Sequence, residues 1–246
     1  MTKKIKKQQV EYIFGINSLT ECLRAKKRKI IALYTTKPVP KAFVVIQKLL
    51  PKYPIQIQYV KRDKLQQLAH TQEHQGVVAM VQKFSYRTTM FSPKKEQFIL
   101  LLDGIQDVRN LGAILRTAYC TGVQGVVLCR KGGTALTGAA HKASAGFAEY
   151  LPIYQAASVQ EAVQQIQSAG YQLYTTTFSG QDATAVSYKM PLCIVIGSEG
   201  KGVTQSIIKN SIQISLPQKR QTISYNASVA TGITLFLVAH QINAIK

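Results

Sequence analysis

The sequence lacks any apolar run long enough to cross a membrane as a helix. Its longest apolar stretch, residues 233–239 with their neighbours, is well short of the roughly 20 residues that a membrane span requires. The N-terminal residues are basic but lack the apolar core of a signal peptide. These two absences predict a cytoplasmic protein that does not bind a membrane.

Cysteine is scarce, and its spacing argues against a metal site. The four cysteines (Cys22, Cys120, Cys129 and Cys193) form no CxxC pair, and no cluster of cysteine and histidine has the spacing of metal ligands. Three of the four lie inside apolar segments. We therefore expect buried structural thiols in a reducing compartment, and no bound metal.

Acidic residues are also scarce, and the resulting positive charge is unevenly distributed. The chain has 31 lysines and arginines against 11 acidic residues, a net charge of +20. Residues 1–96 contain 20 basic and 5 acidic residues, so three quarters of the excess lies in the first two fifths of the chain. Such an asymmetry is typical of a region that binds a polyanion, most often nucleic acid. A basic face that serves only solubility is the alternative.

The pattern of apolar residues divides the chain into four parts. Residues 1–9 form a basic tail, and residues 10–83 alternate short helical and strand-like segments, as in a small α/β domain. Residues 84–96 follow neither periodicity and contain a proline and a lysine pair, which predicts a linker. Residues 97–246 form the second domain.

The second domain has the alternating pattern of a parallel α/β fold. Strand-like apolar runs occur at residues 98–102, 126–129, 150–154, 171–178, 192–196 and 212–216. The clearest helix between them spans 158–169, where Ser158 and Glu161 form a capping box and Gly170 ends the helix. Short apolar strands alternating with helices predict a mostly parallel sheet covered on both faces. The last helix, at about 226–244, is apolar nearly all round, so we expect it to be buried, with a second subunit as one possible partner.

Three blocks of polar residues and glycines lie at the edges of apolar segments in this domain. They are Asn110-Leu-Gly-Ala-Ile-Leu-Arg-Thr-Ala118, Ile194-Val-Ile-Gly-Ser-Glu-Gly-Lys-Gly202, and Leu216-Pro followed by Ser224-Tyr-Asn-Ala-Ser228. Parallel sheets build their sites from several strand ends in this way. The three blocks together therefore predict one site.

Taken singly, each block has an ordinary structural interpretation beside the functional one. Arg116 lies off the apolar stripe of its helix and is either a site residue or an ion-pair partner. Glu199 lies beside glycines, which let a backbone approach a ligand closely, although an isolated turn of this kind is more often structural. Ser224 and Asn226 stand at a helix entrance, where capping is the simpler role for Asn226. We see no Ser/His/Asp order and no paired carboxylates, and we assign no catalytic role to the four histidines.

Together, and in this order, the blocks resemble the SpoU family of RNA ribose 2′-O-methyltransferases, within the SPOUT class. The matching pattern is Asn-x-Gly-Ala-x-x-Arg-Thr-Ala, then Gly-x-Glu-Gly-x-Gly, then Pro … Ser-x-Asn-x-Ser, and the resemblance covers residues 97–246. In the first domain, Ile13-Phe-Gly-Ile-Asn-Ser and His74-Gln-Gly-Val-Val-Ala resemble the ribosomal-protein-L30e-like substrate-binding domain of the rRNA guanosine branch, the RlmB type.

This resemblance implies a fold, a cofactor and partners. The fold is a mostly parallel sheet whose C-terminal segment forms a deep trefoil knot, a rare exception to unknotted topology that no periodicity predicts. S-adenosylmethionine is held by the knot loops, and a homodimer completes the site across its interface. The implied reaction transfers a methyl group to a ribose 2′-OH of RNA, with large-subunit (23S) rRNA as the expected substrate.

The resemblance also implies roles for ten residues. Those that match the catalytic motifs are Asn110, Arg116, Glu199, Ser224 and Asn226. Those that fall where the knot loops hold the cofactor are Thr176, Gly197, Gly200, Leu216 and Tyr225. A ribose 2′-OH is nearly un-ionised at neutral pH and must lose its proton during attack. We expect Arg116 beside that hydroxyl, as proton acceptor or orienting group, with Asn110 and Glu199 positioning it.

Four positions depart from the family's pattern. Val108 replaces a proline, and in the third motif Gln218 replaces methionine, Arg220 glycine and Tyr225 leucine. At position 220 a bulky side chain is expected either to disturb the loop and pocket or to reach an RNA phosphate. The polar residues of catalytic type are retained, so we expect an active enzyme. A tRNA methyltransferase is one alternative, and a non-catalytic RNA-binding or ribosome-assembly protein on the same scaffold is the other.

Overall fold

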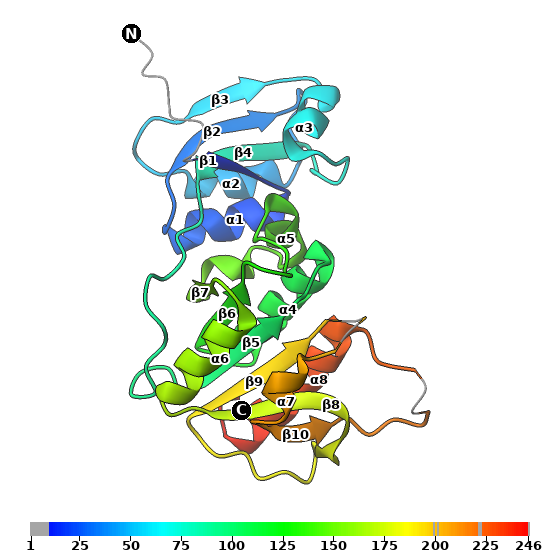
Figure 1. Ribbon diagram of the computed structural model, residues 1–246. Helices are drawn as coiled ribbons and strands as arrows, with labels where there is room; N and C mark the ends of the chain where they lie inside the picture. Colours follow the sequence, from blue (N-terminus) through cyan, green and yellow to red (C-terminus); the bar gives the residue numbers. More distant parts are fainter. Residues whose placement is uncertain (1–9, 199, 201, 221–222, 246) are drawn as a thin grey trace. The chain divides into compact units, whose positions relative to one another are not determined.

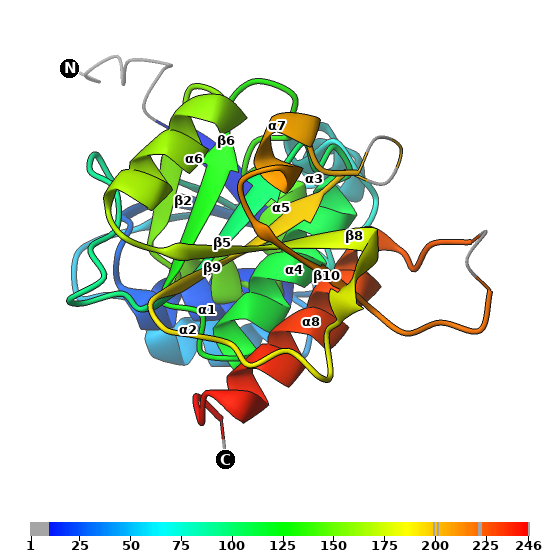
Figure 2. The same ribbon diagram turned by 60° about the horizontal axis from the view of Figure 1, so that its bottom comes forward.

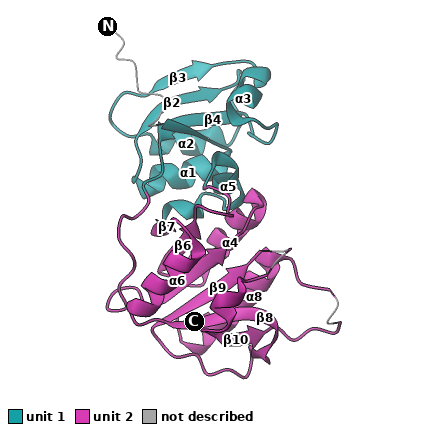
Figure 3. Cartoon of the chain, in the orientation of Figure 1, with its two compact units in different colours: residues 1–85, 136–150 teal, residues 86–135, 151–246 magenta. Residues whose placement is uncertain are grey.

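The structure is a computed structural model that describes residues 10–198, 200, 202–220 and 223–245 (Figure 1). It divides into two compact units (Figure 3). Unit 1 comprises residues 1–85 and 136–150, and unit 2 comprises residues 86–135 and 151–246. The chain therefore passes between the units three times. Among the described residues, no helix is both long and apolar enough to span a membrane.

Unit 1 contains a four-stranded sheet in the order β1-β4-β2-β3. Strands β2 and β3 are parallel, and the other two pairs are antiparallel. Alternate residues of the strands face opposite sides, so Ile13 and Ala79 pack with α1 and α2 while Phe14 and Val78 pack with α3. The elements are β1 (Val10–Phe14), α1 (Ile16–Ala25), β2 (Ile30–Thr35), α2 (Phe43–Leu49), β3 (Gln56–Tyr59), α3 (Arg62–Ala69) and β4 (Val77–Gln82).

Residues 136–150 belong to unit 1, although the segments before and after them belong to unit 2. They form α5 (Gly138–Ala143) and the 3-10 turn η1 (Phe147–Glu149), which pack against β1 and α1. A β-carbon at position 138 would lie 2.3 Å from the carbonyl oxygen of Tyr12, so only glycine allows this approach. The sequence-based division assigned this segment to residues 97–246, because nothing in its composition sets it apart from its neighbours.

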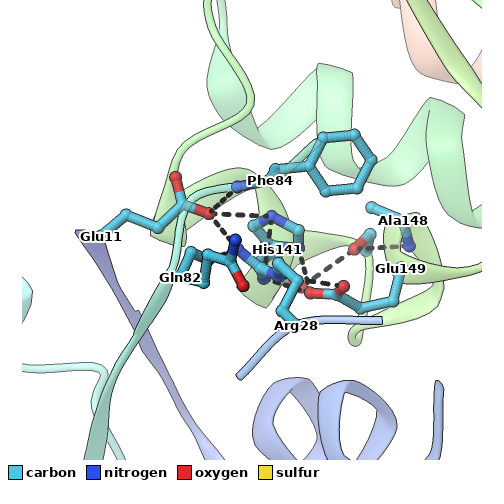
Figure 4. A network of polar contacts seen from close by, with 8 residues as sticks. Glu11, Arg28, Gln82, Phe84, His141, Ala148 and Glu149 are labelled. Carbon is cyan, nitrogen blue, oxygen red and sulfur yellow. Dashed lines mark hydrogen bonds and ion pairs between the residues drawn. The ribbon is translucent and has the colours of Figure 1, made fainter. Parts of the chain in front are cut away.

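A buried ion cluster attaches this segment to the rest of unit 1 (Figure 4). Arg28, in the basic run after α1, is 6% exposed and forms ion pairs with Glu11 of β1 and Glu149 of η1. Its Nε also donates to Glu149 Oε2 at 3.1 Å, which makes that pair bidentate. His141 of α5 lies fully buried beside them. Burial and the charge of Arg28 hold the pKa of His141 well below its usual range, so its ring is neutral.

Unit 2 contains a six-stranded sheet in the order β10-β8-β9-β5-β6-β7, in which every neighbouring pair is parallel. Helices α4 and α8 lie on one face of this sheet, and α6 and α7 on the other (Figure 2). The prediction of a parallel sheet covered on both faces is confirmed; the knot stays a prediction. The elements are β5 (Phe98–Asp103), α4 (Val108–Cys120), β6 (Gly125–Cys129), β7 (Ile153–Ala156), α6 (Val159–Ser168), β8 (Gln172–Asp182), β9 (Leu192–Gly197), α7 (Gln205–Ile208), β10 (Ile212–Ser215) and α8 (Ala227–Gln241).

Two local expectations were wrong. The strand predicted at 150–154 begins only at Ile153, and Tyr150 is the last residue of the segment packed in unit 1. Cys120, at the exposed end of α4, is not buried, whereas Cys22, Cys129 and Cys193 are. Burial raises the pKa of both Cys22 and Cys129 to about 12, so these thiols stay protonated and unreactive at neutral pH.

Candidate active site

The carboxyl ends of neighbouring strands bring the three predicted blocks together in unit 2. Asp103, the last residue of β5, lies opposite Gly197, the last residue of β9. The first block follows β5, the second spans the end of β9 and the loop after it, and the third connects β10 to α8. Loops that leave one edge of a parallel sheet in this way surround common pockets.

The larger of two pockets here has a volume of about 750 Å³ and lies between the β8, β9 and β10 ends. Its wall contains Ser224 and all five residues that the resemblance assigned to the cofactor, namely Thr176, Gly197, Gly200, Leu216 and Tyr225. Apolar side chains, among them Ile196, Val203 and Ile208, line the same space. An apolar pocket with a few polar groups and accessible backbone is the usual form of a small-molecule site.

One wall of this pocket is formed by a part of β8 where the pairing with β10 is interrupted, which the sequence did not predict. Strand β10 pairs with Thr175 at Gln213 and with Gln181 at Ile214, so residues 176–180 leave the ladder. Four of them line the pocket, including Phe178, which is 66% exposed. The sequence showed this segment as one continuous strand because a bulge of this kind leaves the apolar pattern before it unchanged.

The smaller pocket has a volume of about 230 Å³ and adjoins the larger one. It is lined by the β5–α4 loop, including Gln106 and Asp107, and by Asn110 on the first turn of α4. Ser198, Gly200 and Ala227 line both pockets. The first and second blocks therefore meet at the boundary between two connected spaces.

The loop after β9 is closed at its base by its own backbone. Ser198 N–H donates to the Gly202 carbonyl at 3.1 Å, and Gly202 N–H donates to the Ser198 carbonyl at 2.9 Å. A β-carbon on Gly197 would lie 2.2 Å from the Gly202 carbonyl carbon, so a side chain at 197 would force the loop open. Glu199, predicted within this loop, lies outside the described residues.

Asn226 is a helix cap, and Val108, one of the departures from the family pattern, follows another cap directly. Asn226 caps α8, its Oδ1 accepting from Ser228 N–H at 2.9 Å and from Val229 N–H at 3.4 Å. The capping interpretation of Asn226 therefore describes its position in this chain. Asp107 caps α4 through the Arg109 N–H at 2.7 Å, and Val108 takes the first helical position without the usual proline.

Arg116 does not line either pocket. It is exposed on α4, six residues after Asn110. Six residues of helix advance about 9 Å and turn about 120° away from the starting face, so one chain does not direct both side chains into one pocket. Arg220, the departure expected to narrow the pocket, is also exposed and outside its lining, whereas Gln218 lines it.

Within the described part of the chain, no group of three histidine, cysteine or acidic side chains is arranged to hold a metal ion. The described linings of the two pockets offer backbone groups, hydroxyls, amide side chains and the carboxylate of Asp107.

Comparison with known families accounts for both units. A family model described as the SpoU rRNA Methylase family matches residues 97–236, which is more than half of the chain. The chain belongs to the SpoU family. A second model, described as RNA 2′-O ribose methyltransferase substrate binding, matches residues 12–87, so both regions of the predicted resemblance are confirmed. SpoU proteins are S-adenosylmethionine-dependent RNA methyltransferases, and this chain is an enzyme of that class.

Relatives of known name are similar over the full length. YacO of Bacillus subtilis, assigned to the TrmH family of tRNA/rRNA methyltransferases, is 36% identical over 97% of this chain and 98% of its own. RlmB of Shewanella oneidensis, a 23S rRNA (guanosine-2′-O-)-methyltransferase, is 30% identical over 96% of this chain and 99% of its own.

Solved structures share the fold. The SpoU methyltransferase AviRb from Streptomyces viridochromogenes, in complex with AdoMet (S-adenosylmethionine), superposes with a TM-score of 0.79 at 18% identity, over 100% of this chain and 95% of its own. An AdoMet-bound rRNA methyltransferase from Sinorhizobium meliloti gives 0.79 at 22% identity, over 95% and 88%.

Proposed function

We propose that this SpoU enzyme methylates a ribose 2′-OH of large-subunit (23S) rRNA. The observation that carries the proposal is the similarity to RlmB, which extends over both units and not over the catalytic unit alone. A tRNA substrate is the second candidate, because the name of the Bacillus relative covers tRNA as well as rRNA.

The larger pocket fits S-adenosylmethionine in size and in the chemistry of its wall. Gly197 and Gly200 leave backbone groups accessible, Thr176 and Ser224 offer hydroxyls, and Leu216 supplies apolar contact. Bound there, the cofactor supplies an electrophilic methyl group on a sulfonium. The adjoining smaller pocket then holds the acceptor ribose, with Asn110 in its wall.

The protein's task is to align the acceptor and to help remove its proton. Asn110 is placed to orient the ribose within the smaller pocket. The guanidinium of Arg116 stays protonated at neutral pH, so it cannot readily accept the proton of the ribose hydroxyl. Its several N–H donors can instead hydrogen-bond the hydroxyl and the adjacent phosphate. We assign Arg116 this orienting role.

For Arg116 to reach a pocket, it must act in the site of a second subunit. Helix α8 buries one face and leaves a stripe of exposed apolar side chains, Val229, Ile233 and Phe236. The prediction that α8 is buried all round is wrong for one chain, and a second copy would cover this stripe. The Thr117 methyl lies 3.8 Å from where a β-carbon on Gly232 would be, so α4, which carries Arg116, packs beside α8.

In unit 1, exposed tyrosines covered by lysines suit RNA. Lys37 Nζ lies 4.4 Å from the ring centroid of Tyr59, at the end of edge strand β3, and Lys29 Nζ lies 5.5 Å from that of Tyr53. Tyr59 is 51% exposed. Residues 22–72 contain twelve lysines and arginines but one acidic residue, Asp63. Stacking surfaces inside a positive field are typical of sites for unpaired RNA bases.

Replacing Tyr59 tests this surface. Tyr59→Ala is expected to weaken binding of an rRNA fragment about tenfold, because a base stacked on an aromatic ring contributes about 1–3 kcal/mol. Tyr59→Phe should bind within about twofold of the wild type, since stacking is retained. Filter binding at fixed salt measures both, and cofactor affinity should not change. Equal losses in both variants, or none, would contradict stacking.

The proposed reaction is tested by transfer of labelled methyl from S-adenosylmethionine to 23S rRNA and to bulk tRNA in parallel. We expect label in rRNA, recovered after alkaline hydrolysis as a resistant 2′-O-methyl dinucleotide. Label in tRNA alone would retain the chemistry and replace the substrate. Label in an alkali-sensitive base-methylated nucleotide would refute 2′-O-methylation.

A further inference from the structure

A carboxylate outside the predicted blocks joins two parts of the site that are far apart in sequence. Asp103 Oδ2 accepts from the Thr204 N–H at 2.9 Å and from the Thr204 hydroxyl at 2.7 Å, across 101 residues. Both groups are partly buried. Hydrogen bonds to an ionised carboxylate are stronger than those between neutral groups.

Each residue of this pair is adjacent in sequence to residues that line a different pocket. Asp103 is followed directly by the loop that lines the smaller pocket, beginning at Gly104. Thr204 directly follows Val203, which lines the larger pocket, and it occupies the N-cap position of α7. One carboxylate thus connects the wall of the acceptor pocket to the wall of the cofactor pocket.

The same carboxylate also closes the loop after β9. In the sheet, Asp103 lies opposite Gly197, where the loop departs, and its side chain binds Thr204, where the loop ends. Inside this span, the Ser198 and Gly202 backbones are bonded to each other. The two ends of the loop are therefore joined twice. The inner link is the pair of backbone hydrogen bonds between Ser198 and Gly202, and the outer link is formed by the hydrogen bonds from Thr204 to Asp103.

We propose that Asp103 is a positioning residue for methyl transfer, acting through Thr204. It holds the described ends of the loop after β9, residues 197–198 and 202–203, where they form part of the wall of the larger pocket, and it fixes the separation of donor and acceptor pockets. It is not a catalytic residue, because neither Asp103 nor Thr204 lines a pocket. This proposal rests on the proposed placement of S-adenosylmethionine and ribose in the two pockets.

The variants differ in how many of the two hydrogen bonds survive. Asp103→Ala removes both, and we expect the KM for S-adenosylmethionine to rise about tenfold or more, with a fall in kcat of similar size, because two charge-assisted bonds are lost. Thr204→Val keeps the backbone bond and should show about half that effect on a logarithmic scale. Thr204→Ser keeps both bonds and should restore wild-type constants.

The chain provides a matched control in Asp182. Its Oδ1 accepts from the Thr184 N–H at 2.8 Å and from the Thr184 hydroxyl at 2.7 Å, the same pairing across two residues and exposed to solvent. Asp182→Ala removes a local turn contact, so KM and kcat should stay within about twofold of the wild type.

Methyl transfer and cofactor binding by calorimetry are measured on folded protein, with circular dichroism as the check. A structural role alone would lower the melting temperature and leave KM unchanged, which would overturn the proposal, as would equal constants for Thr204→Val and Thr204→Ser. If Asp103→Ala does not fold, the two Thr204 variants decide. Failure of the wild type itself to bind the cofactor would refute the proposed function, and is read before any variant.

Discussion

Mixing two inactive variants of this enzyme is expected to restore methyl transfer. In the first, Arg116→Ala removes the guanidinium and should lower turnover at least about a hundredfold. In the second, Ser224→Trp fills the wall of the larger pocket at an exposed position, so that the cofactor is excluded while folding is retained. The expectation follows from Arg116 lying outside both pockets of its own chain.

The activity of the mixture shows whether Arg116 acts in the pocket of its own chain or in that of the partner subunit. In a heterodimer, the open pocket belongs to the chain that lacks Arg116, and the other chain supplies that arginine across the interface. Random pairing makes half of the dimers mixed, each with one working site, so activity should return to about one quarter of wild type. If Arg116 served its own pocket, no dimer in the mixture would hold a working site.

The two variants are co-expressed with different affinity tags, and both the mixture and the doubly tagged species are assayed with labelled cofactor. Every doubly tagged dimer has one working site of two, so this species should show about half of wild-type activity. Phe236→Asp in both chains is the control, because a charge in the exposed stripe of α8 should leave monomers on gel filtration and abolish recovery. Isolated heterodimers without activity would contradict action across the interface. A wild-type chain that is active as a monomer would contradict it as well.

Replacing Arg28 is expected to be among the most destabilising single changes in unit 1. Arg28→Met leaves Glu149, which is 1% exposed, without its cation, and breaking a buried pair in this way costs about 3–5 kcal/mol. The loss should appear in the free energy of unfolding of unit 1, followed by denaturant titration with Tyr fluorescence and circular dichroism. Because the chain has two units, the transitions are fitted separately.

Arg24 provides the comparison. It pairs with Glu21 at 2.6 Å on the surface of α1, and its side chain is 52% exposed. Arg24→Met should cost less than about 1 kcal/mol, because water screens an exposed pair. Adding Glu149→Gln to Arg28→Met should recover part of the loss by removing the unpaired charge. Similar losses for Arg24→Met and Arg28→Met would show that burial of the cluster contributes nothing.

What the sequence predicted correctly is local or ordered along the chain. The alternation of short apolar strands with helices indicated the parallel sheet, and the three polar blocks followed strands whose carboxyl ends meet at one edge. The five residues that the resemblance assigned to the cofactor, two of them glycines, all line one pocket. Their binding roles, and that of Glu199, stay predictions for the experiments above.

What the sequence did not predict depends on contacts between distant residues. Asp103 and Thr204 carry no pattern that links them, since each is an ordinary polar residue at a strand end and a helix start. The apolar circumference of α8 indicated burial, but it did not distinguish the face covered by its own chain from the face left exposed. The sequence placed Phe178 inside a continuous strand. The register shift that takes it out of the ladder depends on how β10 pairs with β8, which the sequence of β8 alone does not show.

The placement of residues 136–150 in unit 1 has a consequence for how the protein is made. Arg28 is translated 121 residues before Glu149, so a ribosome completes β5, α4 and β6 before unit 1 receives its last buried carboxylate. Strand β9, which lies between β8 and β5 in the other sheet, is later still. Neither unit can therefore finish folding in the order of synthesis, because unit 1 waits for residues 136–150 and unit 2 waits for β9 and the segments after it.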